Sequence, residues 1–292
     1  MERDEIEDMR RQLLSDDDMP ADKHGHQHRP GTSDADTAFE SDGSTAEPAR
    51  PPGPRRTTLQ KVLGGVGEVL VTVGVLMLLM VAYQLWWTNV EGSQAIAAQR
   101  DQIVSAWEKD PQPLPSDPAD IPPLKQPPYG TGFALLYIPR MESKVNGLPV
   151  AQGVGQDVLA QGAGHYRGTA MPGEVGNFAI AAHRSGHGEP FGDFAELRTG
   201  DKVYVQTKDA WYTYTLTTDE PNLTPYDTWV IEPVPGEPQA TPTQKLITLT
   251  TCTPRYGSTG RWAWFGELTD VAPASEVPEG VQAMPGTPAT ST

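Results

Sequence analysis

The stretch Lys245-Leu-Ile-Thr-Leu-Thr-Thr-Cys-Thr-Pro-Arg255 alternates apolar and polar residues until it reaches a cysteine. This period of two, in a run rich in β-branched residues, is typical of a half-buried β-strand. Cys252 is the one cysteine of the 292-residue chain. A single thiol forms no internal disulfide and supplies too few ligands for a thiolate-rich metal site. Cys252 is therefore an inert buried residue, an intermolecular link or a nucleophile, and its surroundings favour the nucleophile.

Short runs with the same period recur on both sides of this stretch, and the sequence is all-β in character beyond Gly130. Residues 208–210 read as a hairpin turn, and helical signal is limited to turns near 156–160 and 190–197. Seven or more short strands with turn residues between them predict a small barrel or sandwich, and the pattern does not decide which. The predicted strands are 133–138, 177–182, 202–207, 211–217, 228–232, 246–251 and 262–268.

A catalytic cysteine needs a nearby base or cation, because the thiolate is the reactive form. His183 ends a predicted strand and enters a glycine-punctuated loop, which is where a side chain emerges at the rim of a barrel. Arg261 begins the strand after Cys252 and is our candidate for the donor to an oxyanion. Arg255 is its rival, placed in the intervening loop. Taken singly, Cys252 also fits a small buried hydrophobe and His183 a structural histidine.

An apolar segment far upstream, residues 62–87, is long enough to cross a hydrocarbon core of about 30 Å. Its one charge, Glu68, lies near the entering end, and Tyr83, Trp86 and Trp87 mark the exit. Basic residues flank the entering side closely, and few follow the exit. The positive-inside rule then predicts a cytoplasmic N-terminus and an extracellular domain. The basic residues used are Arg50, Arg55, Arg56 and Lys61 before the span and Arg100 after it.

Composition divides the chain into five segments. We expect a disordered acidic cytoplasmic tail at 1–57, a transmembrane signal-anchor helix at 62–87, a stalk at 92–129, a catalytic domain at 130–271 and a disordered Pro/Ala/Thr-rich tail at 272–292. The stalk combines an amphipathic helix, with Ser93 as a possible cap, and a Pro-rich spacer that lifts the domain off the membrane. The net charge of −16, without a basic stripe, argues against nucleic acid as a partner. His24-Gly-His-Gln-His28 is interpreted as a solvated polar tract rather than a metal site.

Three ordered blocks resemble the sortases, the cell-surface cysteine transpeptidases of Gram-positive bacteria. Thr248-Leu-Thr-Thr-Cys252 followed by Arg261 is similar to the TLxTC…R signature of that family. Ala182-His-Arg-Ser-Gly-His-Gly-Glu-Pro-Phe191 resembles the stretch around its catalytic histidine, and Asp193-Phe-Ala-Glu-Leu-Arg-Thr-Gly-Asp201 the segment after it. Gly164-His-Tyr-Arg-Gly-Thr-Ala170 and Thr251-Cys-Thr-Pro254 look most like the class E group of actinobacteria.

The resemblance implies a closed eight-stranded sortase barrel with Cys252 as nucleophile, His183 as general acid/base and Arg261 as support for the oxyanion or substrate backbone. It implies cleavage of the Thr–Gly bond in a C-terminal sorting motif, through a thioacyl intermediate resolved by a cell-wall amine. Class E members prefer Leu-Ala-x-Thr-Gly, and Tyr166 is the candidate to bond the Ala amide that proline would lack. Thr251 is expected to line the same groove. No cofactor or metal is implied. The expected partners are secreted proteins bearing the motif, the amine acceptor and the plasma membrane.

Other readings stay open at this point. An L,D-transpeptidase-like cross-linker would carry a His-Gly-Cys neighbourhood, which Thr-Thr-Cys lacks. A non-catalytic membrane-tethered surface module would make Cys252 inert packing, and a pilin-polymerising sortase would use a lysine as acceptor. We interpret His165 and His187 as structural or loop residues.

Overall fold

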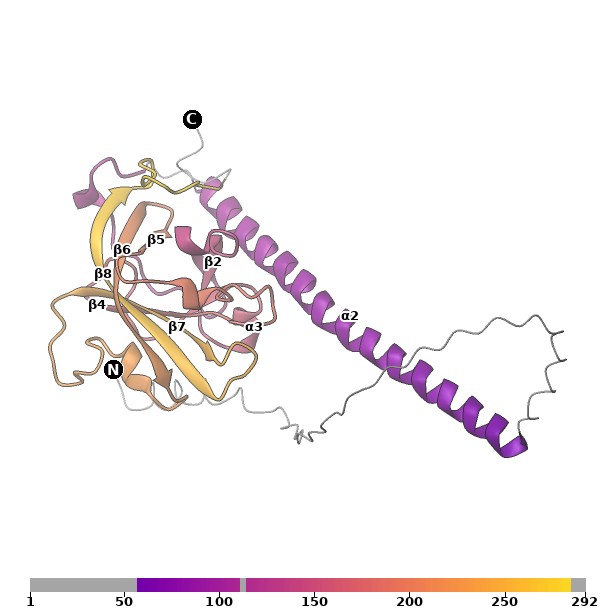
Figure 1. The fold of residues 1–292 in the computed structure, drawn as a ribbon. Coiled ribbons are helices and arrows are strands. Elements are labelled where there is room, and N and C mark those ends of the chain that lie inside the picture. Colours follow the sequence, from indigo (N-terminus) through magenta and orange to yellow (C-terminus); the bar gives the residue numbers. More distant parts are fainter. Residues whose placement is uncertain (1–56, 111–113, 285–292) are drawn as a thin grey trace, which may run out of the picture. The chain divides into compact units, whose positions relative to one another are not determined.

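The computed structural model describes residues 57–110 and 114–284. Its folded part is a closed barrel in the order β1-β2-β3-β4-β7-β8-β6-β5 (Figure 1). This confirms the eight-stranded all-β barrel that the sequence resemblance implied. The strands are β1 Gly132–Tyr137, β2 Asn146–Gln152, β3 Ala163–His165, β4 Gly176–Ala181, β5 Lys202–Gln206, β6 Ala210–Leu223, β7 Lys245–Thr253 and β8 Gly260–Pro273.

The barrel is filled by the inward-facing residues of these strands, among them Phe178, Ile180, Tyr214 and Ile247, each at most 1% exposed. A smaller cluster around Ala179, with Val230 and Ile231, lies outside this main core. Because both faces of β4 are buried, its sequence is apolar without alternation from Phe178 to Ala181.

Three elements depart from the predicted set. The predicted strand 228–232 is wrong: these residues form the 3-10 helix η4, Thr228–Ile231, in which Val230 and Ile231 are both buried. Adjacent burial of this kind does not occur along a strand with one covered face. Strands β2 and β3 were not predicted from the sequence. The first contains Gly147 and Pro149, and the second is three residues long, so neither carries a strong period-two signal.

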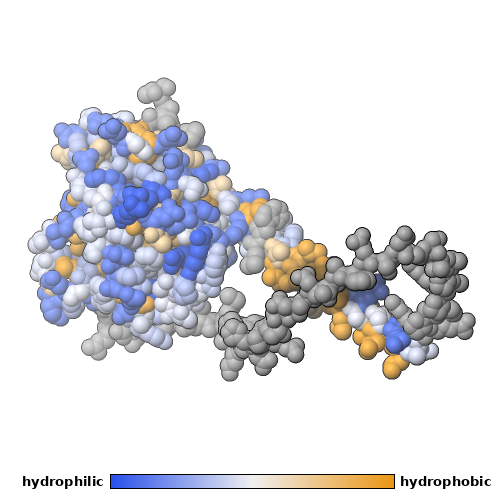
Figure 2. Space-filling view, in the orientation of Figure 1, coloured by the Kyte–Doolittle hydropathy of each residue, from blue (hydrophilic) through white to orange (hydrophobic). Residues whose placement is uncertain are grey.

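Helix α2 runs without a break from Thr58 to Glu108. The sequence predicted two separate helices, a span at 62–87 and a stalk helix from 92. That division is wrong, because the structure has one helix across both. Ser93 is not a cap, because it lies inside the helix and its hydroxyl donates to the carbonyl of Asn89 at 2.8 Å. Among the described residues α2 is the one helix long and apolar enough to cross a membrane. Figure 2 shows its hydrophobic side chains in orange.

The last part of α2 packs on the barrel. Ile103 is buried with Leu135, Tyr137 and Trp211. Further on, Ile121 and Leu124 pack on the main core, so the segment predicted as a free spacer lies against the domain. The other short helices are η1 Pro118–Asp120, η2 Pro139–Met141, α3 Gln156–Leu159 and η3 Phe194–Glu196. The last two fall within the helical turns predicted near 156–160 and 190–197.

The domain also extends beyond residue 271. Strand β8 continues to Pro273, and the indole of Trp211 donates to the carbonyl of Ala274 at 3.2 Å. The hydroxyl of Tyr204 reaches the carbonyl of Glu279. A disordered tail beginning at 272 is therefore wrong for residues 272–284. The rest of that tail, the acidic segment 1–56 and the tract His24–His28 lie outside the described residues.

Candidate active site

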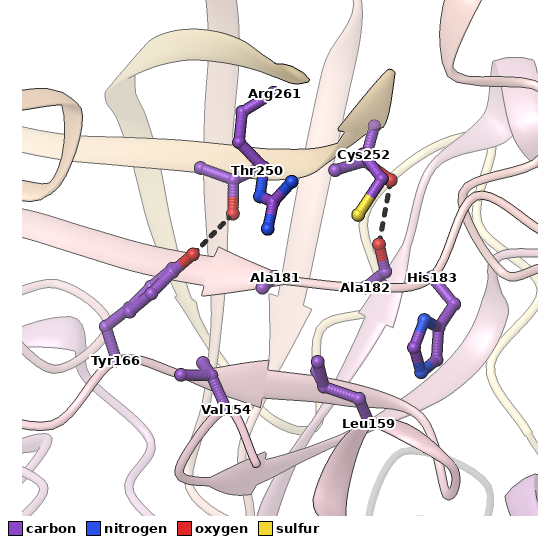
Figure 3. Close-up of a pocket in the computed structure, with 10 residues that line it drawn as sticks. Val154, Leu159, Tyr166, Ala181, Ala182, His183, Thr250, Cys252 and Arg261 are labelled. Carbon is purple, nitrogen blue, oxygen red and sulfur yellow. Dashed lines mark hydrogen bonds between the residues drawn. The ribbon is translucent and has the colours of Figure 1, made fainter. Parts of the chain in front are cut away.

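One pocket of the barrel collects chemically competent side chains at the carboxyl ends of β4 and β7. Figure 3 shows the sulfur of Cys252 between the guanidinium of Arg261 and the imidazole of His183 in this view. The structure thus brings together all three residues that the sequence singled out for the reaction. The full lining is Val154, Leu159, Tyr166, Ala181, Ala182, His183, Thr250, Thr251, Cys252 and Arg261.

Cys252 owes its place to the two neighbours of β7. It faces Arg261 directly across the antiparallel pair of β7 and β8. On its other side β7 runs parallel to β4, where Thr250 is the partner of Ala181. Because side chains of a strand alternate between faces, Thr250 and Cys252 share a face of β7. The register therefore sets the depth of the thiol relative to the guanidinium.

His183 comes two residues after the end of β4 and is fixed by the backbone around it. The amide of Ala182 donates to the carbonyl of Thr250 at 3.2 Å, and the hydroxyl of Thr251 donates to the carbonyl of Ala182 at 2.8 Å. The imidazole stacks on that of His187, with 4.9 Å between ring centroids. These contacts hold the ring of His183 at the level of Cys252. Thr251, predicted to line the substrate groove, lines this pocket and also ties β7 to the histidine segment.

The loop that follows His183 has a constrained backbone. His187 has φ of 49° and Glu189 has φ of 51°, a left-handed conformation that costs free energy for residues with a side chain. Gly92 of α2 lies directly beneath: a Cβ built on it would stand 2.3 Å from the carbonyl carbon of His187. Asn89 donates from its amide to Glu189 at 3.2 Å. The helix and the histidine loop are therefore in close contact.

The two candidate arginines differ in surroundings. Arg261 lines the pocket, and one of its terminal nitrogens donates to the carbonyls of Ser258 and Gly260 at 2.7 and 3.0 Å. Arg255 does not line the pocket. It pairs with Glu189 at 3.1 Å. Burial disfavours the charged carboxylate of Glu189, but Arg255 and Asn89 together hold its pKa below the ordinary range.

Tyr166 is 3% exposed, and its hydroxyl lies 3.0 Å from the hydroxyl of Thr250 (Figure 3). Thr250 in turn donates to the carbonyl of Ile180 at 3.1 Å. A threonine hydroxyl has one proton. With that proton given to Ile180, Tyr166 is the donor to Thr250, and the phenol oxygen keeps its capacity to accept.

Two residues in or next to the pocket were not singled out from the sequence. Thr250 could have been found from the period of two, because it precedes Cys252 by two residues on the strand. Arg184 follows His183 and lies outside the pocket lining; the residue is 9% exposed, and its guanidinium lies over the ring of Trp262. From the sequence, only its place in the block around His183 pointed to Arg184, because the burial of a charged side chain cannot be predicted from a local pattern.

His165 lies away from the pocket lining and is fully buried. Its Nδ1 is 2.9 Å from the side-chain oxygen of Gln152, and its Nε2 is 2.8 Å from the hydroxyl of Thr169. Burial lowers the pKa of His165 to about 4, against a smaller opposing effect of the Ala170 carbonyl. The imidazole is therefore neutral near pH 7 and has a structural place in the barrel.

Comparisons with known proteins agree on one family. The sortase domain family matches residues 136–269. The chain is 38% identical over 218 residues to sortase SrtE1 of Streptomyces coelicolor, covering 72% of this chain and 58% of that protein. It is 35% identical over 209 residues to sortase SrtE2 of the same organism, covering 70% of this chain and 80% of that protein. The solved structure of SrtA sortase from Actinomyces oris aligns with a TM-score of 0.53 at 38% identity, over 57% of this chain and 96% of that one.

Proposed function

This chain belongs to the sortase family of cysteine transpeptidases, in its class E group, and on that premise we propose that it is a membrane-anchored enzyme that cleaves a C-terminal sorting motif, Leu-Ala-x-Thr-Gly, at the Thr–Gly bond. It joins the released carboxyl end to a cell-wall amine. The observation that carries this proposal is the shared pocket of Cys252, His183 and Arg261.

In the first half-reaction the thiolate of Cys252 attacks the carbonyl carbon of the threonine. A carbon–sulfur bond forms and the Thr–Gly carbon–nitrogen bond breaks. His183, as imidazolium, gives its proton to the departing glycine amine. The product is a thioester between Cys252 and the threonine. The sulfur and the imidazole flank one opening, which suits attack and proton delivery on the same peptide bond.

In the second half-reaction an amine attacks the thioester carbon. The new carbon–nitrogen bond forms, the carbon–sulfur bond breaks and the thiolate of Cys252 returns. His183 takes the proton that the attacking amine loses. The acceptor we propose is an amine of a cell-wall peptide precursor, and the donors are secreted proteins that carry the motif.

Arg261 stabilises the charge that develops on the threonine oxygen in both half-reactions. Its side chain is held by the carbonyls of Ser258 and Gly260, so the guanidinium is oriented before substrate binds. A donor fixed in advance lowers the barrier because nothing has to reorganise as the oxyanion forms.

Tyr166 selects alanine over proline before the threonine. Its hydroxyl lies 3.0 Å from that of Thr250 at the wall of the pocket, and a phenol oxygen can accept a hydrogen bond. The backbone amide of alanine supplies that donor, whereas proline has none. Thr250 and Thr251 form the adjoining wall of the pocket.

Helix α2 anchors the enzyme, with its N-terminus in the cytoplasm and the barrel outside the cell. The support is its apolar length and the excess of lysine and arginine on its N-terminal side. The barrel then lies on the side of the membrane where secreted substrates and cell-wall acceptors meet.

The proposal is tested with the full chain in detergent micelles and two peptides that differ only at Ala or Pro of the motif. We expect cleavage between Thr and Gly, faster for the Ala peptide, and none in Cys252→Ala. Cleavage that persists in Cys252→Ala would reject the nucleophile. A folded wild-type protein that cleaves neither peptide would favour a non-catalytic surface module.

A further inference from the structure

The residue after His183 is a buried cation in unusual surroundings. The guanidinium of Arg184 lies over the ring of Trp262, 4.9 Å from its centroid, and donates to the hydroxyl of Thr253 at 3.3 Å. Thr253 directly follows Cys252, and Trp262 directly follows Arg261. Arg184 thus contacts β7 and β8 through the residues that alternate with the thiol and the pocket arginine.

Among the residues that the structure describes, none forms an ion pair with Arg184, and its Nε has no hydrogen-bond partner. Buried arginines are ordinarily paired, because an uncompensated charge away from water is costly. Arginine also keeps its proton at all ordinary pH values. A positive charge is therefore held here at a cost to stability, which calls for an anion that forms during function.

The charged groups nearby narrow the identity of that anion. The carboxylate of Glu189 is engaged by Arg255 and Asn89, and Asp219 accepts from the indole of Trp262 at 2.9 Å. Asp193 acts on Arg255 rather than on Arg184.

The remaining ionisable groups are the two imidazoles of the loop, His183 and His187, the cation Arg261 and the thiol of Cys252. Burial lowers the pKa of Arg184, Arg255 lowers it further, and Cys252 is the group that raises it.

We propose that Arg184 is a positioning residue whose fixed charge stabilises the thiolate of Cys252. The inference rests on the proposed role of Cys252 as nucleophile and adds a second cation to the site, with a task different from that of Arg261. Arg261 would stabilise the substrate oxygen. Arg184 contacts Thr253 and Trp262, and its charge would act electrostatically on the sulfur of Cys252. A larger thiolate fraction at neutral pH is the result.

The test exploits the single cysteine of the chain. The rate of alkylation by iodoacetamide, followed by mass spectrometry as a function of pH, reports the ionisation of Cys252 without any peptide substrate. In Arg184→Met we expect alkylation to slow about tenfold at neutral pH, with the profile moved to higher pH by about one unit. Arg184→Lys keeps the charge and should stay close to the wild type.

The matched control is Arg255→Met, which removes a neighbouring guanidinium that is already paired with Glu189 and should leave the profile nearly in place. An unchanged profile in Arg184→Met would overturn the proposal, as would an equal shift in Arg255→Met. Removing an unpaired buried charge should not lower Tm. Should Arg184→Met fail to fold, Arg184→Gln, which keeps a donor for Thr253 without the charge, is measured in the same way.

The two proposals fail separately. A shifted alkylation profile in a protein that cleaves no sorting peptide contradicts the proposed function and supports the charge effect. Normal peptide cleavage by the wild type, with an unchanged alkylation profile in Arg184→Met, supports the proposed function and contradicts the charge effect.

Discussion

Cys252 and Arg261 are directly opposed residues on neighbouring antiparallel strands, although nine positions separate them in the chain. Opposed residues of such a pair have Cα atoms roughly 4.5–5.5 Å apart and side chains on one face. The loop between them holds the rival Arg255, whose charge is directed to Glu189 instead. The pairing of β7 and β8 thus places Arg261 in the pocket and leaves Arg255 in the loop outside it.

The first prediction concerns these arginines. Arg261→Ala should lower kcat/KM for a Leu-Ala-x-Thr-Gly peptide by roughly 10²–10³, the usual cost of losing a donor to an oxyanion. Arg255→Ala, outside the pocket, is the control and should cost far less. Steady-state cleavage kinetics measure both. If Arg261→Ala kept its full rate, Arg261 would have no place in the site.

The second prediction concerns peptide selectivity. Tyr166→Phe removes the acceptor for the alanine amide, so the ratio of kcat/KM between Ala and Pro peptides should fall by roughly tenfold, as expected for one hydrogen bond. Competition between the two peptides in one reaction measures the ratio. Tyr204→Phe removes a hydroxyl that contacts Glu279, away from the pocket, and should leave the ratio unaltered. A ratio that stays the same in Tyr166→Phe would exclude the selective role.

The third prediction concerns the contact between α2 and the histidine loop. A methyl group at Gly92 would overlap the backbone of His187, whose ring stacks on His183. Gly92→Ala should therefore cost about 1–3 kcal/mol of stability and reduce cleavage. Gly74, on the same helix, has nothing within 4 Å of a built Cβ, so Gly74→Ala should be silent. Equal Tm and rate in the two variants would show that this contact does not matter.

The fourth prediction concerns acid stability. The pKa of His165 is about 4 in the folded chain, below its ordinary value near 6.5. Between these values the unfolded chain binds the extra proton, so stability falls as pH drops from 6.5 toward 4, by roughly 3 kcal/mol in all. Denaturant unfolding at several pH values measures this slope. His165→Asn should flatten this slope, and a slope unaffected by His165→Asn would refute the assignment.

The sequence predicted the barrel and the three central residues better than their surroundings. β7 carries much of the period-two pattern, and the sortase blocks singled out Cys252, His183 and Arg261, which the structure places in one pocket. The 3-10 helix at Thr228–Ile231 was missed because its sequence is rich in β-branched residues, which are also typical of a strand. The contacts of Gly92 and the burial of Arg184 depend on segments far apart in the chain, which no local pattern encodes.

Mass spectrometry of the intact protein, quenched in acid during reaction with a Leu-Ala-x-Thr-Gly peptide, tests the central claim most directly. The account predicts a species heavier by the peptide fragment that ends at threonine, joined to Cys252, absent in Cys252→Ala and discharged by an added amine. In His183→Ala the adduct should form and decay slowly. Turnover of the peptide without any adduct on Cys252 would contradict the account.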